Sequence, residues 1–285
     1  MWREKVRVYA GFVKIEHSVF ALPFAYMGLF LARRGWPGLA NFVLLTVAMV
    51  AVRSYSMGVN RLADVRFDRQ NPRTQMRELV RGALSVREGW LFVAGCAAVF
   101  VLACWGLNRL CLALSPVVLV WAGLYSYTKR FTWLCHVFLG SVLGLAPVAG
   151  WLAVTPEFSL ATVLLGLGVT FWVAGFDVLY ACHDAAFDKG VGLNSMPVRF
   201  GVGPALSLAG LMHANAVVFF ALAGWAAGLG GFYYMFLGLT GFLLAVEHQL
   251  ISEYDLSRVN VAFFTINGVI AASLFLGVLA DLLTQ

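Results

Sequence analysis

Three side chains between positions 60 and 68 bring oxygen atoms together at a helical spacing. Asn60, Asp64 and Asp68 follow one another at intervals of four residues, which places them along one face of a helix. Two carboxylates this close repel each other unless a cation lies between them, and either an arginine or a divalent ion meets that need. A ligand set made only of oxygen atoms suits Mg²⁺, which proteins hold through a few carboxylates together with water and substrate phosphates. Arg53, seven residues before Asn60, is expected on the same face.

The same carboxylate spacing occurs a second time, in FDVLYACHDAAFDKGVGLNSMPVRFG at residues 176–201. Asp184 and Asp188 are four residues apart, and Asp177 precedes Asp184 by seven, so a continuous helix would present all three on one face. An ion-paired helix end exposed to solvent explains one such motif, but it gives no reason for the spacing to occur twice. The repeat therefore predicts two carboxylate pairs that hold two or more Mg²⁺ ions, with a diphosphate bridging them.

The composition shows where such motifs must sit. The chain has 285 residues, of which 61% are hydrophobic and only 12% are charged, and its mean hydropathy is +0.83. A soluble domain is about 25% charged, so these values predict an integral membrane protein. Its apolar runs are continuous rather than alternating, which favours helices over a barrel.

Nine apolar runs predict an all-α membrane protein with nine transmembrane helices in one domain, residues 1–285. The expected spans are 17–33, 38–59, 90–107, 110–127, 133–154, 159–180, 204–228, 231–248 and 260–283. Two polar connections are long, at about 60–89 and 181–203, and each contains one Asp motif. Long connections in a compact bundle are usually functional. Near the last polar connection, Glu247 is expected to face solvent.

The positive charges predict the orientation in the membrane. Sixteen of the 20 lysines and arginines fall in segments on the same side as the N-terminus, three fall on the other side, and Arg53 lies within a span. This asymmetry places the N-terminus and both Asp-rich connections in the cytoplasm. The arginines flank spans and form no stripe interleaved with exposed aromatic residues, so nucleic acid is excluded as a partner. Without an evident cleavable signal or transit peptide, the expected location is a bacterial inner membrane.

A charged site at a membrane face implies a ligand with a charged head and a long apolar tail, and a polyprenyl diphosphate fits. Magnesium would stabilise the charge on the departing diphosphate. The allylic cation left behind would need aromatic rings and a dry cavity to shield it from water.

These motifs carry a resemblance to the UbiA family of intramembrane aromatic prenyltransferases. The first is N-x-x-x-D-x-x-x-D at residues 60–68, the second is D-x-x-Y-A-x-x-D-x-x-x-D at residues 177–188, and the third is YSYTKR at residues 125–130. The resemblance implies a helical bundle around a central cavity and two cytoplasmic Asp-rich loops that bind Mg²⁺ and prenyl diphosphate. Many relatives have proline where this chain has Ser126.

The segments YSYTKRFTWLCH, LGLAPVAGW and GLNSMPVRFG resemble those of 4-hydroxybenzoate polyprenyltransferases. That group includes relatives expected to act in the futalosine route to menaquinone, with 1,4-dihydroxy-6-naphthoate as acceptor. Both acceptors are phenols that bear a carboxylate, and Arg53 is the candidate to bind it. The alternative is a structural pair between Arg53 and Asp177. Asp177 would otherwise orient or deprotonate the phenol.

The expected site residues fall into three sets. The catalytic set is Asp64, Asp68, Asp177, Asp184 and Asp188, and the metal ligands are Asn60, Asp64, Asp68, Asp184 and Asp188. The expected substrate-binding residues are Arg53, Asn60, Arg73, Tyr125, Lys129, Tyr180, Asn194, Ser195 and Arg199. The histidines, including His136, are expected to pack or to lie at an interface.

Two other functions remain open on the sequence. An ion-coupled transporter would place its acidic residues near the membrane midplane, and the arginine-rich loops here would repel a cation. A lipid-diphosphate phosphotransferase would also use Asp and Mg²⁺, but the D-G-x-x-A-R signature of the CDP-alcohol class is absent. The expected partners are polyprenyl diphosphate, an aromatic hydroxy acid and membrane lipid, and no protein partner can be inferred.

Overall fold

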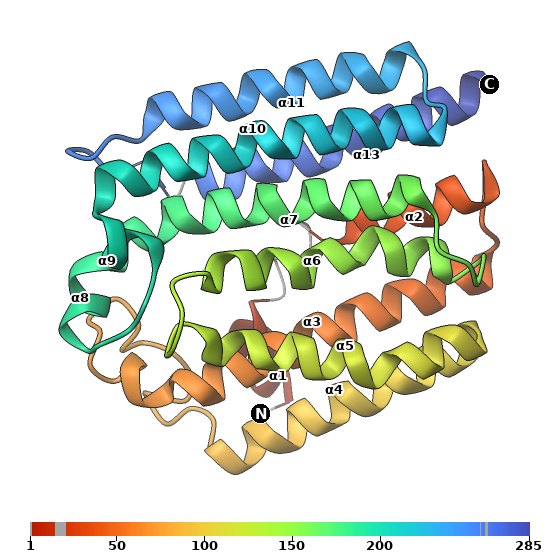
Figure 1. The fold of residues 1–285 in the computed structure, drawn as a ribbon. Coiled ribbons are helices and arrows are strands. Elements are labelled where there is room, and N and C mark those ends of the chain that lie inside the picture. The colour runs from red at the N-terminus through yellow and green to blue at the C-terminus, as the bar shows by residue number, and fades with distance from the viewer. Residues whose placement is uncertain (1, 15–20, 257, 260–261) are drawn as a thin grey trace. The chain divides into compact units, whose positions relative to one another are not determined.

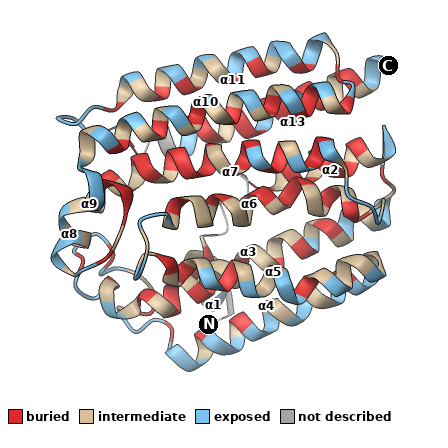
Figure 2. Cartoon of the chain, viewed as in Figure 1, coloured by how far each residue is buried: buried red, intermediate tan, exposed pale blue. Residues whose placement is uncertain are grey.

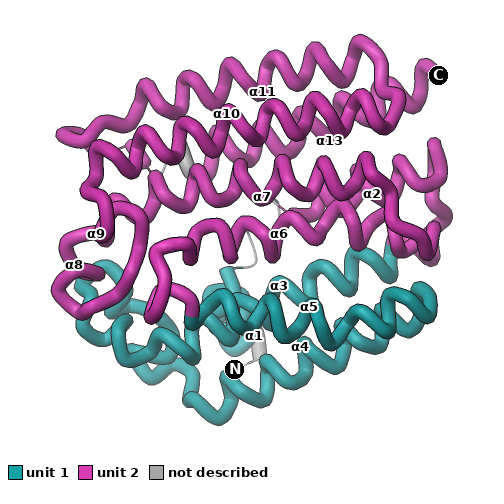
Figure 3. Tube along the Cα trace, in the orientation of Figure 1, with its two compact units in different colours: residues 1–18, 43–127 teal, residues 19–42, 128–285 magenta. Residues whose placement is uncertain are grey.

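The computed structural model describes residues 2–14, 21–256, 258–259 and 262–285, and this part of the chain is helical without any strand (Figure 1). The chain divides into two compact units (Figure 3). Unit 1 comprises residues 1–18 and 43–127, and unit 2 comprises residues 19–42 and 128–285. The all-α prediction is therefore confirmed for the described residues.

The described residues of unit 1 form four helices. They are α1 (Trp2–Val13), α3 (Leu39–Asp68, within this unit from Val43), α4 (Val86–Leu107) and α5 (Arg109–Thr128, within this unit to Tyr127). Small residues let α3 and α4 approach closely, because Ala48 and Ala51 pack against Phe100 and Ala103. Ser85 begins α4 with a capping box, in which its side chain and that of Glu88 exchange hydrogen bonds with backbone N–H groups.

A second apolar cluster of unit 1 surrounds the end of α3. It contains Phe12 and Val13 of α1, Val59 and Leu62 of α3, Leu79 and Leu84 of the connection, and Val93 of α4. The two leucines anchor the connection after α3 onto the helix that precedes it. This connection is thus packed against the first Asp motif.

Unit 2 is built around α7 (Leu160–Ala181), which is buried along most of its length (Figure 2). The other long helices are α2 (Leu22–Arg33), α6 (Cys135–Leu152), α10 (Val202–Ala227), α11 (Gly231–Leu250) and α13 (Asn267–Thr284). The shorter pieces are η2 (Cys182–Asp184), α8 (Ala185–Gly190), α9 (Met196–Phe200) and η3 (Ala262–Ile266).

Close contact between α6 and its neighbours depends on glycine. A Cβ atom at Gly140 would collide with the backbone oxygen of Thr170 on α7, and one at Gly150 would collide with that of Ala25 on α2. Helices in a membrane associate mainly through such close packing, because lipid offers no hydrophobic driving force. The Gly140 contact thus holds α6 close to α7, and the Gly150 contact holds it close to α2.

Within the described residues, seven helices are long and apolar enough to cross a membrane, which shows an integral membrane protein. The expected number of nine is not confirmed. The first expected span, 17–33, corresponds to α2, which has only 12 residues, and positions 17–20 lie outside the described residues. The eighth, 231–248, corresponds to α11, whose last turn carries the polar residues Glu247 and His248. Positions 260–261 of the ninth are also outside the described residues.

Residues 60–68 of the polar connection expected at 60–89 are helical, as the spacing of the first motif predicts, because α3 continues to Asp68. One further expectation is wrong. Glu247 does not face solvent, since it is 1% exposed and accepts a hydrogen bond from Asn267 Nδ2 at 2.9 Å. The central cavity and the cytoplasmic N-terminus stay predictions.

Candidate active site

The first Asp motif occupies the last turns of α3 in unit 1. Asn60, Asp64 and Asp68 lie on one uninterrupted helix, as the spacing predicts, and Asn60 Nδ2 donates to Asp64 Oδ2 at 3.4 Å. Both carboxylates are buried, with Asp64 2% and Asp68 6% exposed. Burial of two carboxylates so close together needs compensating positive charge.

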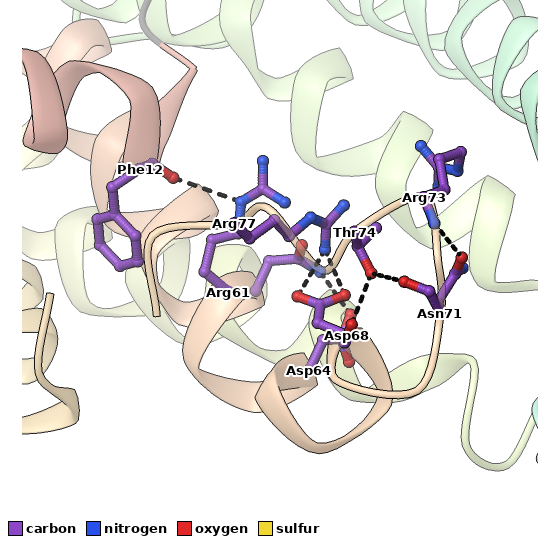
Figure 4. A network of polar contacts seen from close by, with 9 residues as sticks. Phe12, Arg61, Asp64, Asp68, Asn71, Arg73, Thr74 and Arg77 are labelled. Carbon is purple, nitrogen blue, oxygen red and sulfur yellow. Dashed lines mark hydrogen bonds and ion pairs between the residues drawn. The ribbon is translucent and has the colours of Figure 1, made fainter. Parts of the chain in front are cut away.

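The connection after α3 supplies one cation. Arg77 NH1 donates to both carboxylate oxygens of Asp68, at 2.6 and 2.7 Å (Figure 4). Thr74 Oγ1 donates to the backbone oxygen of Asp68 at 3.0 Å, and this bond turns the chain back over the helix end. Arg77 was not among the expected site residues. Arg73, which was expected there, is exposed, and its backbone N–H donates to Asn71 Oδ1 at 2.9 Å.

A second arginine that sequence reasoning missed is Arg61, on the same helix. Its guanidinium is buried, and Nε donates to the backbone oxygen of Phe12 at 3.4 Å (Figure 4). In the described part of the chain, its NH1 atom is buried without a hydrogen-bond partner. Arg61 was interpreted only as one of the charges that set the membrane orientation. Its place directly after Asn60, within the first Asp motif, was the one feature of the sequence that could have indicated a role at the site.

Arg53 lies on α3 seven residues before Asn60, about two turns closer to the N-terminal end of the helix. Its NH1 atom donates to the backbone oxygen of Val13, the last residue of α1, at 3.0 Å. The guanidinium thus binds one of the carbonyl groups that a helix end leaves without an intrahelical partner. The contact shows that Arg53 ties α1 to α3, and the expected contact with an acceptor carboxylate stays a prediction. Tyr125, on α5, is partly exposed.

The second Asp motif, in unit 2, does not lie on one continuous helix. Asp177 belongs to α7, Asp184 ends the 3₁₀-helix η2, and Asp188 belongs to α8. A 3₁₀ turn advances about 120° per residue, against 100° in an α-helix, so positions beyond it are rotated relative to those before it. The expected single α-helix is therefore interrupted at η2, and the shared face of the three carboxylates stays a prediction. Tyr180 is partly exposed on the last turn of α7.

Asp177 has a partner that the sequence did not suggest. His136 Nδ1, on the first turn of α6, lies 2.7 Å from Asp177 Oδ2. The other ring nitrogen of His136 accepts a hydrogen bond from the backbone N–H of Met196 at 3.3 Å. His136 was expected to be a packing or interfacial residue, and instead it joins α6, α7 and α9. The expectation missed it because 41 positions separate the two side chains in the sequence.

The remaining expected residues of unit 2 form the connection before α9. The backbone oxygen of Lys129 accepts hydrogen bonds from Asn194 N at 2.7 Å and from Asn194 Nδ2 at 3.4 Å. Ser195 Oγ accepts from the backbone N–H of Val198 at 3.3 Å and caps α9. Arg199 is exposed on α9. The structure thus shows a role for Asn194 and Ser195 in ordering the loop, and their contact with substrate stays a prediction.

The donor atoms of the motifs fit magnesium better than zinc. Each unit offers oxygen atoms, from Asn60, Asp64 and Asp68 in unit 1 and from Asp184 and Asp188 in unit 2, and Mg²⁺ prefers such donors. Across the described ranges, no group of three or more His, Cys, Asp or Glu side chains could hold a metal ion. Magnesium commonly completes its shell with water and substrate phosphates, so two carboxylates per motif suffice.

Comparison with known proteins identifies relatives over almost the whole length. The model of the UbiA prenyltransferase family matches residues 21–269. The chain is 31% identical to a 4-hydroxybenzoate octaprenyltransferase of Marinobacter nauticus, covering 96% of this chain and 94% of the relative. It is 32% identical to the protein of the same name from Nitrosospira multiformis, covering 90% and 88%.

Solved structures agree with this relationship. The apo structure of a UbiA homolog from Aeropyrum pernix K1 is 37% identical, with a TM-score of 0.84, and covers 94% of this chain and 98% of its own. A UbiA homolog from Archaeoglobus fulgidus, bound to GPP and Mg²⁺, shares the fold at 23% identity and a TM-score of 0.70, covering 96% and 99%. The family match, the full-length relatives and the shared fold show that this chain is a prenyltransferase and belongs to the UbiA prenyltransferase family.

Proposed function

We propose that this enzyme transfers a polyprenyl group from a polyprenyl diphosphate to the ring of an aromatic hydroxy acid, in the biosynthesis of a respiratory quinone. The acceptor is 4-hydroxybenzoate, for ubiquinone, or 1,4-dihydroxy-6-naphthoate, for menaquinone. The observation that carries the proposal is the pair of D-x-x-x-D motifs in a chain similar over nearly its full length to 4-hydroxybenzoate octaprenyltransferases.

Magnesium is the proposed cofactor, held by Asn60, Asp64 and Asp68 at the first motif and by Asp184 and Asp188 at the second. When bound, it neutralises the charge of the diphosphate and stabilises it as a leaving group. The A. fulgidus homolog was solved with GPP and Mg²⁺, which is consistent with this choice. The proposal for this chain rests on its own carboxylates.

The reaction breaks the allylic C–O bond and one ring C–H bond, and it forms one C–C bond. The allylic C–O bond of the polyprenyl diphosphate breaks, and its electron pair leaves on the diphosphate. A new C–C bond joins the prenyl carbon to the ring carbon ortho to the phenol hydroxyl, and that ring carbon then releases its proton. Asp177 orients or deprotonates the phenol, which raises the electron density at the ortho carbon.

The cationic and polar residues have complementary roles in this proposal. Arg53 binds the carboxylate of the acceptor, for which a planar guanidinium is well suited. The phosphate oxygens are bound by Arg73, Lys129 and Arg199, with Asn194 and Ser195 closing the connection before α9. Tyr125 and Tyr180 line the substrate. The enzyme acts in a bacterial inner membrane, with its active site toward the cytoplasm, and membrane lipid surrounds its apolar helices.

The experiment that tests this function is a product assay on the purified enzyme in detergent. The enzyme is incubated with Mg²⁺, a polyprenyl diphosphate and one acceptor at a time, and the products are analysed by mass spectrometry. Prenylated 4-hydroxybenzoate alone indicates ubiquinone synthesis, and prenylated dihydroxynaphthoate alone indicates menaquinone synthesis. A folded enzyme that prenylates neither acceptor would overturn the proposal.

A further inference from the structure

We propose that His136 is a positioning residue for the reaction: it holds the Asp177 carboxylate in one orientation and couples that orientation to the segment at the start of α9. This inference rests on the role proposed above for Asp177 in orienting or deprotonating the phenol. His136 itself does not need to touch either substrate. Its effect is transmitted through the atoms to which it is hydrogen-bonded.

The two hydrogen bonds of the imidazole determine its tautomer. The backbone N–H of Met196 donates to Nε2, so Nε2 must carry the lone pair. The proton of the neutral ring therefore resides on Nδ1, which lies 2.7 Å from Asp177 Oδ2 and donates to it. A doubly protonated ring would place two donors against each other at the Met196 contact. The geometry thus directs the Nδ1 proton of His136 toward the carboxylate of Asp177.

His136 and Asp177 differ in exposure, as expected if the first side chain positions the second and only the second meets a substrate. The side chain of His136 is 3% exposed, whereas that of Asp177 is 26% exposed. The imidazole therefore lies behind the carboxylate, within the packed protein, and the carboxylate keeps an accessible side. A group that orients a phenol needs such an accessible side, together with a fixed direction.

The Met196 bond extends this support to the loop before α9. The chain at 194–196 also meets Lys129, whose backbone oxygen binds Asn194 N at 2.7 Å. Cys135 Sγ, one residue before His136, lies 3.5 Å from the backbone oxygen of Asn194. Movement of the 194–196 segment would therefore pull on the ring that holds Asp177. Through this ring, the loop proposed to close over the diphosphate and the residue proposed to act on the phenol are joined.

A pair of substitutions separates this role from simple packing. Glutamine at position 136 can donate from Nε2 to Asp177 and accept at Oε1 from Met196 N–H, so His136→Gln preserves both bonds. Leucine has a similar volume without either bond, so His136→Leu removes both. His213→Leu is the matched control, because His213 is also buried in unit 2 and bonds His248 and the backbone oxygen of Trp172, not Asp177.

The readouts are kcat and KM for each substrate, with the unfolding temperature measured in the same detergent. We expect His136→Leu to lower kcat by about 100-fold, the range for loss of a well-placed acid–base group, with KM for polyprenyl diphosphate within about twofold. We expect His136→Gln to recover kcat to within about fivefold of the wild type. His213→Leu should lower the unfolding temperature and leave kcat within about twofold.

Three results would overturn the inference. The first is a wild-type kcat in His136→Leu. The second is an equal loss of kcat in the leucine and glutamine variants. The third is a loss in His136→Leu that matches the loss in His213→Leu at the same drop in unfolding temperature. Wild-type enzyme that prenylates neither acceptor would instead overturn the proposed function itself, so the two failures are distinguishable.

Discussion

The two Asp motifs have the same spacing in the sequence but differ in how their carboxylates are held. In unit 1, the motif lies on one helix, and a guanidinium nine residues further on, that of Arg77, binds Asp68 through both oxygens. In unit 2, the motif is divided among three helical elements, and its first carboxylate is bound by the imidazole of His136 from a different helix. Equal spacing of the carboxylates therefore occurs here on two different backbone arrangements.

The kind of partner matters for what each carboxylate can do. A charged guanidinium that binds both oxygens of Asp68 competes with any metal ion for the same atoms. The imidazole of His136 makes a single contact, at 2.7 Å to one oxygen of Asp177, and so orients the group through that oxygen alone. The comparison suggests that Arg77 holds Asp68 in place at the expense of metal affinity, whereas His136 directs a carboxylate that does not need a metal.

The largest expected effect tests whether both motifs serve one reaction. Asp64→Ala and Asp184→Ala should each lower kcat by about 1000-fold or more, because each removes a carboxylate ligand of the proposed magnesium. Turnover is measured by mass spectrometry, and size-exclusion elution and the unfolding temperature report on folding. Asp255→Ala, at an exposed carboxylate outside both motifs, is the control. Full activity in either motif variant would remove the metal assignment for that unit.

The next effect concerns the ion pair of unit 1. Arg77→Ala leaves the largely buried Asp68 carboxylate without its bidentate partner, and the free energy of unfolding should fall by about 3 kcal/mol. The same variant should need less Mg²⁺ for half-maximal activity, because the competing cation is gone. Both are measured on purified enzyme, by thermal unfolding and by magnesium titration of the initial rate. Arg73→Ala, at an exposed arginine of the same connection, should change stability by less than about 0.5 kcal/mol. An unchanged or higher magnesium requirement in Arg77→Ala would contradict the competition.

Arg53 allows a sharper comparison between a structural and a binding role. If the guanidinium binds the acceptor carboxylate, Arg53→Ala should raise KM for the aromatic acid by about 10-fold or more, with KM for polyprenyl diphosphate unchanged. If it serves only as a partner for the Val13 carbonyl at the end of α1, stability falls and neither KM changes. If the guanidinium does bind the acceptor carboxylate, an acceptor ester that lacks this charge should show the same KM in wild type and variant. A larger KM change for the ester than for the acid would rule out carboxylate binding.

The sequence predicted local features of the site well and contacts between distant residues poorly. The face shared by Asn60, Asp64 and Asp68 follows from helical periodicity alone, and the structure confirms it. The second motif departs from that periodicity at Cys182–Asp184, where a short 3₁₀ turn interrupts the helix. This turn contains no glycine or proline from which the interruption could have been predicted. Periodicity gives no warning of such a change, because it depends on packing around the turn.

Partners from elsewhere in the chain were beyond the reach of spacing arguments. Arg77 reaches Asp68 through a series of irregular turns. His136 reaches Asp177 across the contact between α6 and α7, where glycines let the two backbones approach closely. Glu247 was expected to face solvent, yet tertiary packing buries it beside Asn267. Apolar length alone also predicted nine spans, a number that is not confirmed, since α2 has only 12 residues. In each case the deciding information is which helices pack together.

The smallest expected effect tests the loop that His136 joins to Asp177. Ser195 caps α9, so Ser195→Ala should lower the free energy of unfolding by about 1 kcal/mol, whereas Ser195→Asp restores the cap with a carboxylate. The aspartate also adds a negative charge, which would repel a diphosphate near the loop and raise its KM by about 10-fold. Thermal unfolding and KM for polyprenyl diphosphate are measured for both variants. A Ser195→Asp enzyme with restored stability and an unchanged KM would show that this loop orders α9 and Asp177 without contacting the diphosphate. A raised KM would place the phosphate beside this loop, so that the segment bound to His136 would also meet the charge of the ligand.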